Sequence, residues 1–293
     1  MVTAKELLHT HFVTVDINDR VSSLIGRQSE AKETFAVVLD GKKYVGLVSK
    51  KWLLTARIDP EKMRIKNILE RRHKAKTPFF VPKLSQKTEL REIARLLVSA
   101  DVRALPVIEK AKGVKGEPFE RVIGIVRAKD VVKAMRDAYV KIPALDIAST
   151  NLVSIREDEE IGKALKLMGS RHVDRLIVLD KRGRLAGILS LFDLIENVHP
   201  KILSKLHIPG AASLGKWKVT GFGVGEKTSI LNLPVSSISK TLPETTCCQA
   251  KTSVAEVIDN IVEKDVTSVV IVDKEQKPIG IVTVKDILQH YSR

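Results

Sequence analysis

The hydrophobic and polar positions of this 293-residue chain repeat four times in the same order. Each block predicts an apolar strand, a turn, a second strand with a glycine, and the start of a helix. The four blocks are AVVLDGKKYVGLVSKKWLL from Ala36, LPVIEKAKGVKGEPFERVIGIVRAKDVV from Leu105, LIVLDKRGRLAGILSLFDLI from Leu176 and VVIVDKEQKPIGIVTVKDIL from Val269. A recurring unit indicates the fold better than any single residue, because overlooking it would misjudge the whole chain.

The residues before each block complete a unit of strand, helix, strand, strand and helix. In the third unit, a short strand at 152–155 precedes a stretch at 160–168 whose apolar residues have helical spacing. Two apolar runs, 175–179 and 185–189, then predict buried strands joined by the turn DKRG. The corresponding helices are SVAEVIDNIVEK in the fourth unit, LREIARLLVSA in the second and a poorer helix former, VSSLIGRQSEA, in the first. In the second unit, residues 109–121 predict an enlarged loop between the strands.

The spacing of the block glycines points to an extra segment late in the chain. Gly46, Gly124, Gly187 and Gly280 mark the four units, and the last interval is the longest. It contains a glycine-rich segment at about 199–239 that no other unit has. We interpret this segment as an insertion or lid beside the second pair of units, and a simple linker is the alternative.

The four units resemble CBS domains, named for the regulatory region of cystathionine β-synthase. The similarity covers nearly the whole chain apart from the segment at 199–239, and it is most specific in the third and fourth units. It implies an α/β fold of four CBS repeats (β-α-β-β-α) paired into two Bateman modules, with an insertion between repeats three and four. We place the first pair at residues 1–140 and the second pair at residues 141–293.

The family has a nucleotide-contact motif: glycine, an apolar residue, any residue, Ser or Thr, two residues, and Asp. Two repeats match it completely, repeat three with Gly187, Ser190 and Asp193 and repeat four with Gly280, Thr283 and Asp286. Glycine allows close approach of a ligand, and hydroxyl and helix N-terminal amide groups suit phosphate oxygens. The Asp can accept both hydroxyls of a ribose. Taken alone, it is better explained as an acid that favours the positive end of a helix.

The first two repeats depart from this motif. Arg127 stands where repeat two should have a hydroxyl, although Asp130 is kept. Trp52 replaces the acid of repeat one, and we interpret its indole as a core aromatic that fills the site. Repeat three adds Arg175 at a position where nucleotide-binding members of the family place a basic residue that contacts phosphate, whereas repeat two has Ala104 there.

The second pair is therefore expected to bind an adenine nucleotide (AMP, ADP or ATP) as a regulatory ligand, with no cofactor required. S-adenosylmethionine, which some family members accept, is the second choice. The residues expected to contact the ligand are Gly187, Ser190, Asp193, Arg175, Gly280, Thr283 and Asp286.

Positive charge is concentrated in the first half of the chain. The net charge is +15, of which residues 1–150 carry 30 − 18 = +12 and residues 151–293 carry 20 − 17 = +3. The densest basic window holds Lys62, Arg64, Lys66, Arg71, Arg72, Lys74 and Lys76. Such asymmetry favours a polyanionic partner, RNA or the ribosome, although a solvated basic face or an acidic protein partner would also explain it.

No constellation of catalytic residues occurs, and we do not expect an enzyme. Seven histidines are scattered, and Cys247 and Cys248 are adjacent, which suits neither a metal site nor a disulfide framework. No apolar window reaches the ~18 residues of a membrane span, and the N-terminus does not resemble a signal peptide, so a cytoplasmic location is expected.

Two hypotheses of function follow. The first is a non-catalytic regulator that responds to adenine nucleotides, binds RNA or the ribosome through its basic half and inhibits translation at low energy. The second is a nucleotide-sensing regulatory subunit of a protein kinase, another enzyme or a transporter. A homodimer is compatible with either hypothesis.

Overall fold

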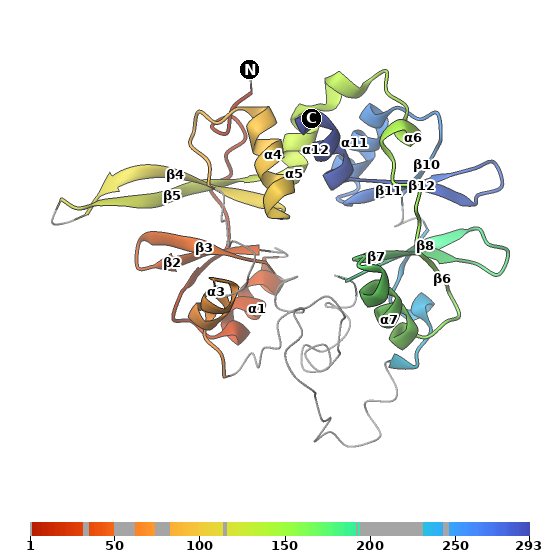
Figure 1. Ribbon diagram of the computed structural model, residues 1–293, viewed down its shortest axis with the longest axis horizontal. Helices are drawn as coiled ribbons and strands as arrows, with labels where there is room; N and C mark the ends of the chain where they lie inside the picture. Colours follow the sequence, from red (N-terminus) through yellow and green to blue (C-terminus); the bar gives the residue numbers. More distant parts are fainter. Residues whose placement is uncertain are drawn as a thin grey trace. The chain divides into compact units, whose positions relative to one another are not determined.

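The computed structural model describes residues 2–31, 35–49, 62–73, 83–113, 116–191, 193, 231–242 and 246–293 (Figure 1). The described chain forms two compact units. The first contains the residues up to Asp137 together with Val284–Arg293, and the second lies within Ala138–Thr283. The predicted boundary between the two pairs of repeats, after residue 140, stays a prediction.

Repeats one, three and four build the same small sheet, in which a short first strand pairs parallel to the second and the second pairs antiparallel to the third. The strands are β1 (Thr14–Asp16), β2 (Phe35–Asp40) and β3 (Lys43–Ser49); β6 (Ser154–Arg156), β7 (Arg175–Leu179) and β8 (Leu185–Ser190); and β10 (Cys247–Gln249), β11 (Ser268–Val272) and β12 (Pro278–Thr283). Repeat two has β4 (Ala104–Lys112) and β5 (Pro118–Arg127), and Leu84 bridges Val107 in parallel where the first strand would lie. These sheets confirm the predicted α/β fold class.

A helix connects the first and second strands of every repeat, as a parallel pair requires. These helices are α1 (Val21–Glu30), α4 (Leu90–Ala100), α7 (Ile161–Arg171) and α11 (Val254–Glu263). In α4 the buried residues Leu90, Ile93, Ala94 and Leu97 recur at helical spacing, so one face packs inward. Within the first unit, α4 also packs against α5 (Ala128–Ala134) and α12 (Val284–Ser292).

A register shift marks the block glycine in all four hairpins. Gly46, Gly124, Gly187 and Gly280 face Val38, Val107, Val178 and Ile271, and each pairing is followed directly by an irregularity in the ladder. A bulge of this kind bends a strand and redirects the residues beyond it. The block glycine therefore has the same backbone setting in every repeat, including repeat one, whose motif lacks the acid.

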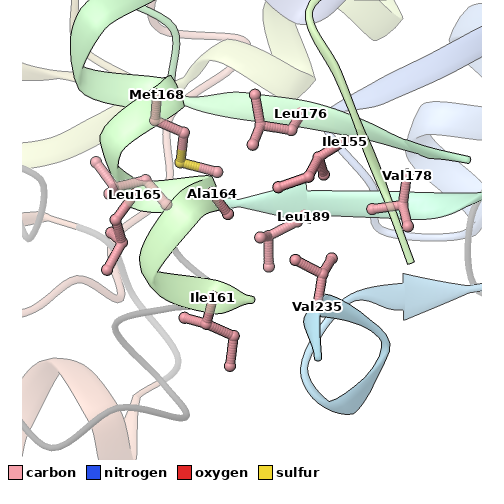
Figure 2. Close-up of a cluster of buried hydrophobic side chains, with 10 residues drawn as sticks. Ile155, Ile161, Ala164, Leu165, Met168, Leu176, Val178, Leu189 and Val235 are labelled. Atoms are coloured by element: carbon pink, nitrogen blue, oxygen red, sulfur yellow. The ribbon is translucent and has the colours of Figure 1, made fainter. Parts of the chain in front are cut away.

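The core of repeat three lies between α7 and one face of its sheet (Figure 2). It contains Ile155, Ile161, Ala164, Leu165, Met168, Leu176, Val178, Leu189, Leu191 and Val235. Val235, in the short 3-10 helix η2 (Val235–Ser237), is completely buried there. Residues 231–239, which the sequence pattern assigned to the insertion, therefore complete this core. Residues 199–230 lie outside the described residues.

The hairpin of repeat two corrects the loop that the sequence predicted at 109–121. Strands β4 and β5 continue through most of this stretch, with Glu109 facing Arg121 and Lys110 facing Glu120. Arg121 Nε donates a hydrogen bond of 2.8 Å to Glu109 Oε1. Opposite charges that face each other across an antiparallel pair stabilise it, so a polar stretch can extend the ladder.

The segment before the first strand of each repeat, here called its leader, crosses to the other repeat of the pair. Bridges at the start of the first helix join Thr3 to Glu89, Arg64 to Arg20, Pro143 to Ser253 and Pro234 to Glu160. Bridges at the last strand join His9 to Ile125, Ser149 to Ile281 and, through β9 (Lys240–Thr241), Lys240 to Ile188. Helices α3 (Ile65–His73) and α6 (Ala144–Ile147) lie within leaders. The crossings pair repeat one with repeat two and repeat three with repeat four.

Candidate functional site

The motif residues of repeat three lie together at one end of its hairpin. Gly187 and Ser190 belong to β8, and Asp193 follows three residues after Ser190. Arg175, the first residue of β7, faces Ser190 in the antiparallel register. Arg175, Ser190 and Asp193 are therefore brought to the same strand end, and Gly187 lies three residues before it in β8.

Asp193 is held tightly by Ser190. Its Oδ2 accepts hydrogen bonds from Ser190 N (2.7 Å) and Ser190 Oγ (2.6 Å), while Asp193 N donates one of 3.2 Å to Ser190 Oγ. This reciprocal arrangement is the capping pattern of a helix N-terminus. Asp193 is only 4% exposed, so a carboxylate is held inside the protein in a fixed orientation. Burial of a charged group requires partners, and Ser190 supplies two of them.

Lys240 is a further member of this site that the sequence pattern did not indicate. Its Nζ lies 3.7 Å from Asp193 Oδ1, and its side chain is 56% exposed. It reaches the site because β9 pairs with β8, with Lys240 facing Ile188 and Thr241 facing Gly187. This pairing requires a glycine at position 187, because a Cβ there would collide with the carbonyl oxygen of Lys240. The chain's own leader thus makes a close approach to Gly187, and contact of this glycine with a ligand stays a prediction.

Arg175 is the more buried of the two cations at this site. Its side chain is 16% exposed, and Nε donates to Asp174 Oδ1 at 3.3 Å. The site thus combines a carboxylate, a hydroxyl and two cations, one half-buried and one exposed. This is a set of groups that can bind a sugar hydroxyl and an anion side by side.

Repeat four presents its motif on the matching elements. Gly280 faces Ile271, and Thr283 ends β12 opposite Ser268, the position that Arg175 has in repeat three. Asp286 lies in the first turn of α12 and is half-buried. A buried serine therefore replaces the arginine of repeat three.

Repeat two shows how a leader can engage a motif acid directly. His9 pairs with Ile125 through its backbone, and its Nε2 lies 2.8 Å from Asp130 Oδ2. A Cβ on Gly124 would lie 2.6 Å from the carbonyl oxygen of His9, so here too the glycine makes room for a leader. No sequence motif indicated His9 or Lys240; their common feature is a position shortly before the first strand of a repeat.

The basic window is only partly described. Lys62, Arg64 and Lys66 are exposed, and Arg64 Nη1 donates a hydrogen bond of 2.7 Å to Asn18 O. Arg71 and Arg72 are part of α3. Lys74, Lys76 and also Trp52 lie outside the described residues.

Other chemistry is sparse in the described part of the chain. No group of His, Cys, Asp and Glu among these residues could hold a metal ion. Burial raises the pKa of the Cys248 thiol to about 11, which makes it less reactive. Within the described ranges, no helix has the length and hydrophobicity needed to cross a bilayer.

The model of the CBS domain family matches residues 80–137, 144–200 and 235–293, which are repeats two, three and four. The chain belongs to the CBS domain family. Repeat one is outside these matches. Its sheet, register shift and leader crossing are those of the other three repeats, so the chain has four CBS repeats in all.

Similar proteins extend over most of this CBS-domain chain. The uncharacterised protein MJ1404 of Methanocaldococcus jannaschii is 27% identical over 98% of the chain, which spans 61% of that protein. Human 5′-AMP-activated protein kinase subunit gamma-3 is 25% identical over 70% of the chain and 39% of the subunit. The chain thus corresponds to part of the length of both relatives.

Solved structures share the fold over nearly the whole chain. The crystal structure of MJ1225 from Methanocaldococcus jannaschii, considered an archaeal homologue of g-AMPK, covers 99% of the chain and all of its own, with a TM-score of 0.70 and 16% identity. An uncharacterised conserved protein from Pyrococcus horikoshii covers the same shares, with a TM-score of 0.59 and 17% identity. These structures support the arrangement of four CBS repeats.

Proposed function

We propose that this CBS-domain protein is a non-catalytic regulator that responds to an adenine nucleotide, AMP, ADP or ATP, bound through the motifs of repeats three and four. The observation that carries the proposal is the fixed carboxylate of Asp193, which is held by Ser190 and lies near Lys240, while Arg175 faces Ser190 across the hairpin. Similarity to a subunit of an AMP-activated kinase supports the same ligand class.

Each group in the repeat-three site has a role toward such a ligand. The carboxylate of Asp193 accepts hydrogen bonds from the ribose diol, which exchange with its present contacts. Arg175 and the hydroxyl of Ser190 bind phosphate oxygens, and a guanidinium suits them because its planar donors match two oxygens at once. S-adenosylmethionine, which has a ribose and no phosphate, is the second candidate because it would use the carboxylate alone.

Ligand binding regulates only if it favours one arrangement of the protein over another. A nucleotide present at 100 times its dissociation constant can contribute at most about 2.7 kcal/mol to such a shift. That is enough to change the population of two nearly balanced arrangements. The protein therefore needs no catalytic group to act as a sensor.

The ligand test is calorimetric titration with AMP, ADP and ATP. Asp193→Ala and Asp286→Ala should each remove or weaken one binding event, because each deletes the acceptor for the ribose. Asp137→Ala is the matched control, since that side chain is 96% exposed and lies outside the motifs. No binding at millimolar nucleotide, or binding unaffected by both motif substitutions, would rule out the proposal.

RNA is the partner we favour, with inhibition of translation at low energy as the regulated outcome. The supporting observation is the exposure of Lys62, Arg64 and Lys66 in the half of the chain that carries most of the net charge. Contacts between such side chains and phosphates release counterions, which provides affinity without base recognition. The alternative is a regulatory subunit of a kinase, another enzyme or a transporter, in which this surface would bind an acidic protein.

Sedimentation with ribosomes from the same source, at two salt concentrations and with or without AMP or ATP, tests the partner. The variant replaces Lys62, Arg64 and Lys66 by Gln, and its charge-matched control replaces the exposed Lys181, Lys274 and Lys277. Co-migration that weakens with salt and in the first variant alone supports RNA. Protein that stays at the top of the gradient at low salt excludes the ribosome and favours the acidic protein partner.

A further inference from the structure

One register position recurs beside the block glycine in three repeats, and a leader residue occupies it each time. His9 pairs with Ile125, Ser149 with Ile281 and Lys240 with Ile188, and each of these strand residues follows directly after the block glycine. The backbone of the three leaders is therefore equivalent at this point, while the side chains differ in charge.

The side chain at this position can reach the motif acid. In repeat two, His9 Nε2 donates to Asp130 Oδ2 over 2.8 Å. In repeat three, Lys240 Nζ lies 3.7 Å from Asp193 Oδ1. Two different basic side chains, carried by leaders far apart in the sequence, thus contact the acid of the motif beside them. This repetition indicates a position that controls what the acid can bind.

We propose that Lys240 is a specificity-determining residue that makes the repeat-three site prefer a phosphorylated nucleoside over the free nucleoside. The proposal rests on the nucleotide function proposed above and adds the ligand charge that this site selects. Beside repeat four, the equivalent position is held by Ser149 of the repeat-three leader, and the residue opposite the motif hydroxyl is Ser268. Neither of these serines is cationic, so the two complete motifs differ in charge at both positions.

The physical reason is that the ammonium group of Lys240 can interact with the carboxylate of Asp193 or with a phosphate of the ligand. Without a ligand, it lies beside the buried carboxylate of Asp193. When a ribose diol donates hydrogen bonds to that carboxylate, the flexible four-carbon side chain of Lys240 allows its ammonium group to bind a phosphate instead. A free nucleoside competes with Lys240 for the carboxylate and offers no anion in return. Lys240 therefore weakens binding of the free nucleoside and strengthens binding of the nucleotide.

The test compares adenosine and AMP in calorimetric titrations of the full chain. All variants carry Asp286→Asn, so that the repeat-three site is measured in the absence of the other motif acid. Lys240→Ser introduces the uncharged side chain of Ser149, which holds the equivalent position in the leader that crosses to repeat four. Lys277→Ser is the matched control, because Lys277 is also an exposed, ion-paired lysine and lies at the hairpin end of β12.

We expect Lys240→Ser to weaken AMP binding by about tenfold, the effect of losing one charge-assisted contact, and to leave adenosine binding equal or stronger. Lys277→Ser should change neither. A parallel loss for both ligands would show a purely structural role and overturn the proposal, as would no change for AMP. If AMP binds the parent chain but this pattern is absent, only the role of Lys240 fails; if neither ligand binds, the nucleotide function fails with it.

A gain-of-function variant provides an independent measurement. In a chain with Asp193→Asn, binding depends on the motif of repeat four, and Ser149→Lys places a lysine at the equivalent leader position. The preference for AMP over adenosine should rise by a similar factor of about ten. An unchanged preference would refute the rule that the leader position sets the ligand charge.

Discussion

The block glycines should differ sharply in their tolerance of alanine, because different atoms lie over them. At Gly187 a Cβ would collide with the backbone of Lys240, whose carbonyl carbon would lie only 3.1 Å away. Backbone atoms in a paired strand cannot give way locally, so Gly187→Ala should separate β9 from β8. The two register pairs lost there, at about 1 kcal/mol of net hydrogen-bond energy each, predict a loss of about 2 kcal/mol in the free energy of unfolding.

Gly280 is the matched control for this substitution. It holds the same register position in repeat four, but a Cβ there would first meet the side-chain Cβ of Ala148 at 3.2 Å. A shift of a few tenths of an ångström relieves that contact, so Gly280→Ala should cost less than about 1 kcal/mol. Gly124→Ala should destabilise the protein about as much as Gly187→Ala, because a Cβ on Gly124 would lie 2.6 Å from the carbonyl oxygen of His9.

Urea denaturation followed by circular dichroism measures these differences, and limited proteolysis reports whether residues 231–242 become accessible in Gly187→Ala. Cleavage in that segment together with the larger loss of stability would support the crossing of the leader. Equal losses at Gly187 and Gly280, or a Gly187→Ala protein as stable as the parent, would refute the reasoning that a leader covers the motif glycine.

Three further predictions concern single side chains. Ser253→Ala removes the capping box with Glu256 at the start of α11 and should cost about 1 kcal/mol in urea denaturation. Tyr44→Phe should stabilise the protein by up to about 1 kcal/mol, because the buried hydroxyl has no hydrogen-bond partner among the described residues; a loss of stability would argue against this. With Cys247→Ser, Cys248 should be alkylated about 200-fold more slowly at pH 8 than an ordinary thiol, because its raised pKa of about 11 leaves little thiolate; mass spectrometry measures the rate.

Much of the fold could be predicted because each hairpin buries an unbroken apolar run. The sequence placed β7 at its observed bounds and β8 to within one residue, and α4 matches the predicted LREIARLLVSA. Periodicity is informative where one face of an element is buried. The charged stretch at 109–121 has no such periodicity, and the ion pair between Glu109 and Arg121 that extends the hairpin depends on register, which composition does not reveal.

The candidate site was predictable only where its residues share one short stretch of chain. Gly187, Ser190 and Asp193 have a fixed spacing, so their meeting follows from local structure. Lys240 reaches Asp193 by a crossing strand of two residues, too short to show any hydrophobic pattern. His9 reaches Asp130 across 121 positions in the same way. Contacts of this kind depend on topology, and no local pattern encodes them.

The crossing of the leaders has a consequence for how such a protein can arise. A leader is inherited with one repeat but completes the other, as Pro234 and Lys240 do beside Glu160 and Ile188. A gene that encoded one repeat alone would produce a chain with an uncovered strand edge and a leader without a surface to cover. Two such chains could cover each other's strand edges by exchanging leaders, so a symmetric dimer of single repeats is compatible with this topology. The smallest piece in which every crossing leader meets its strand within one chain is therefore the pair of repeats.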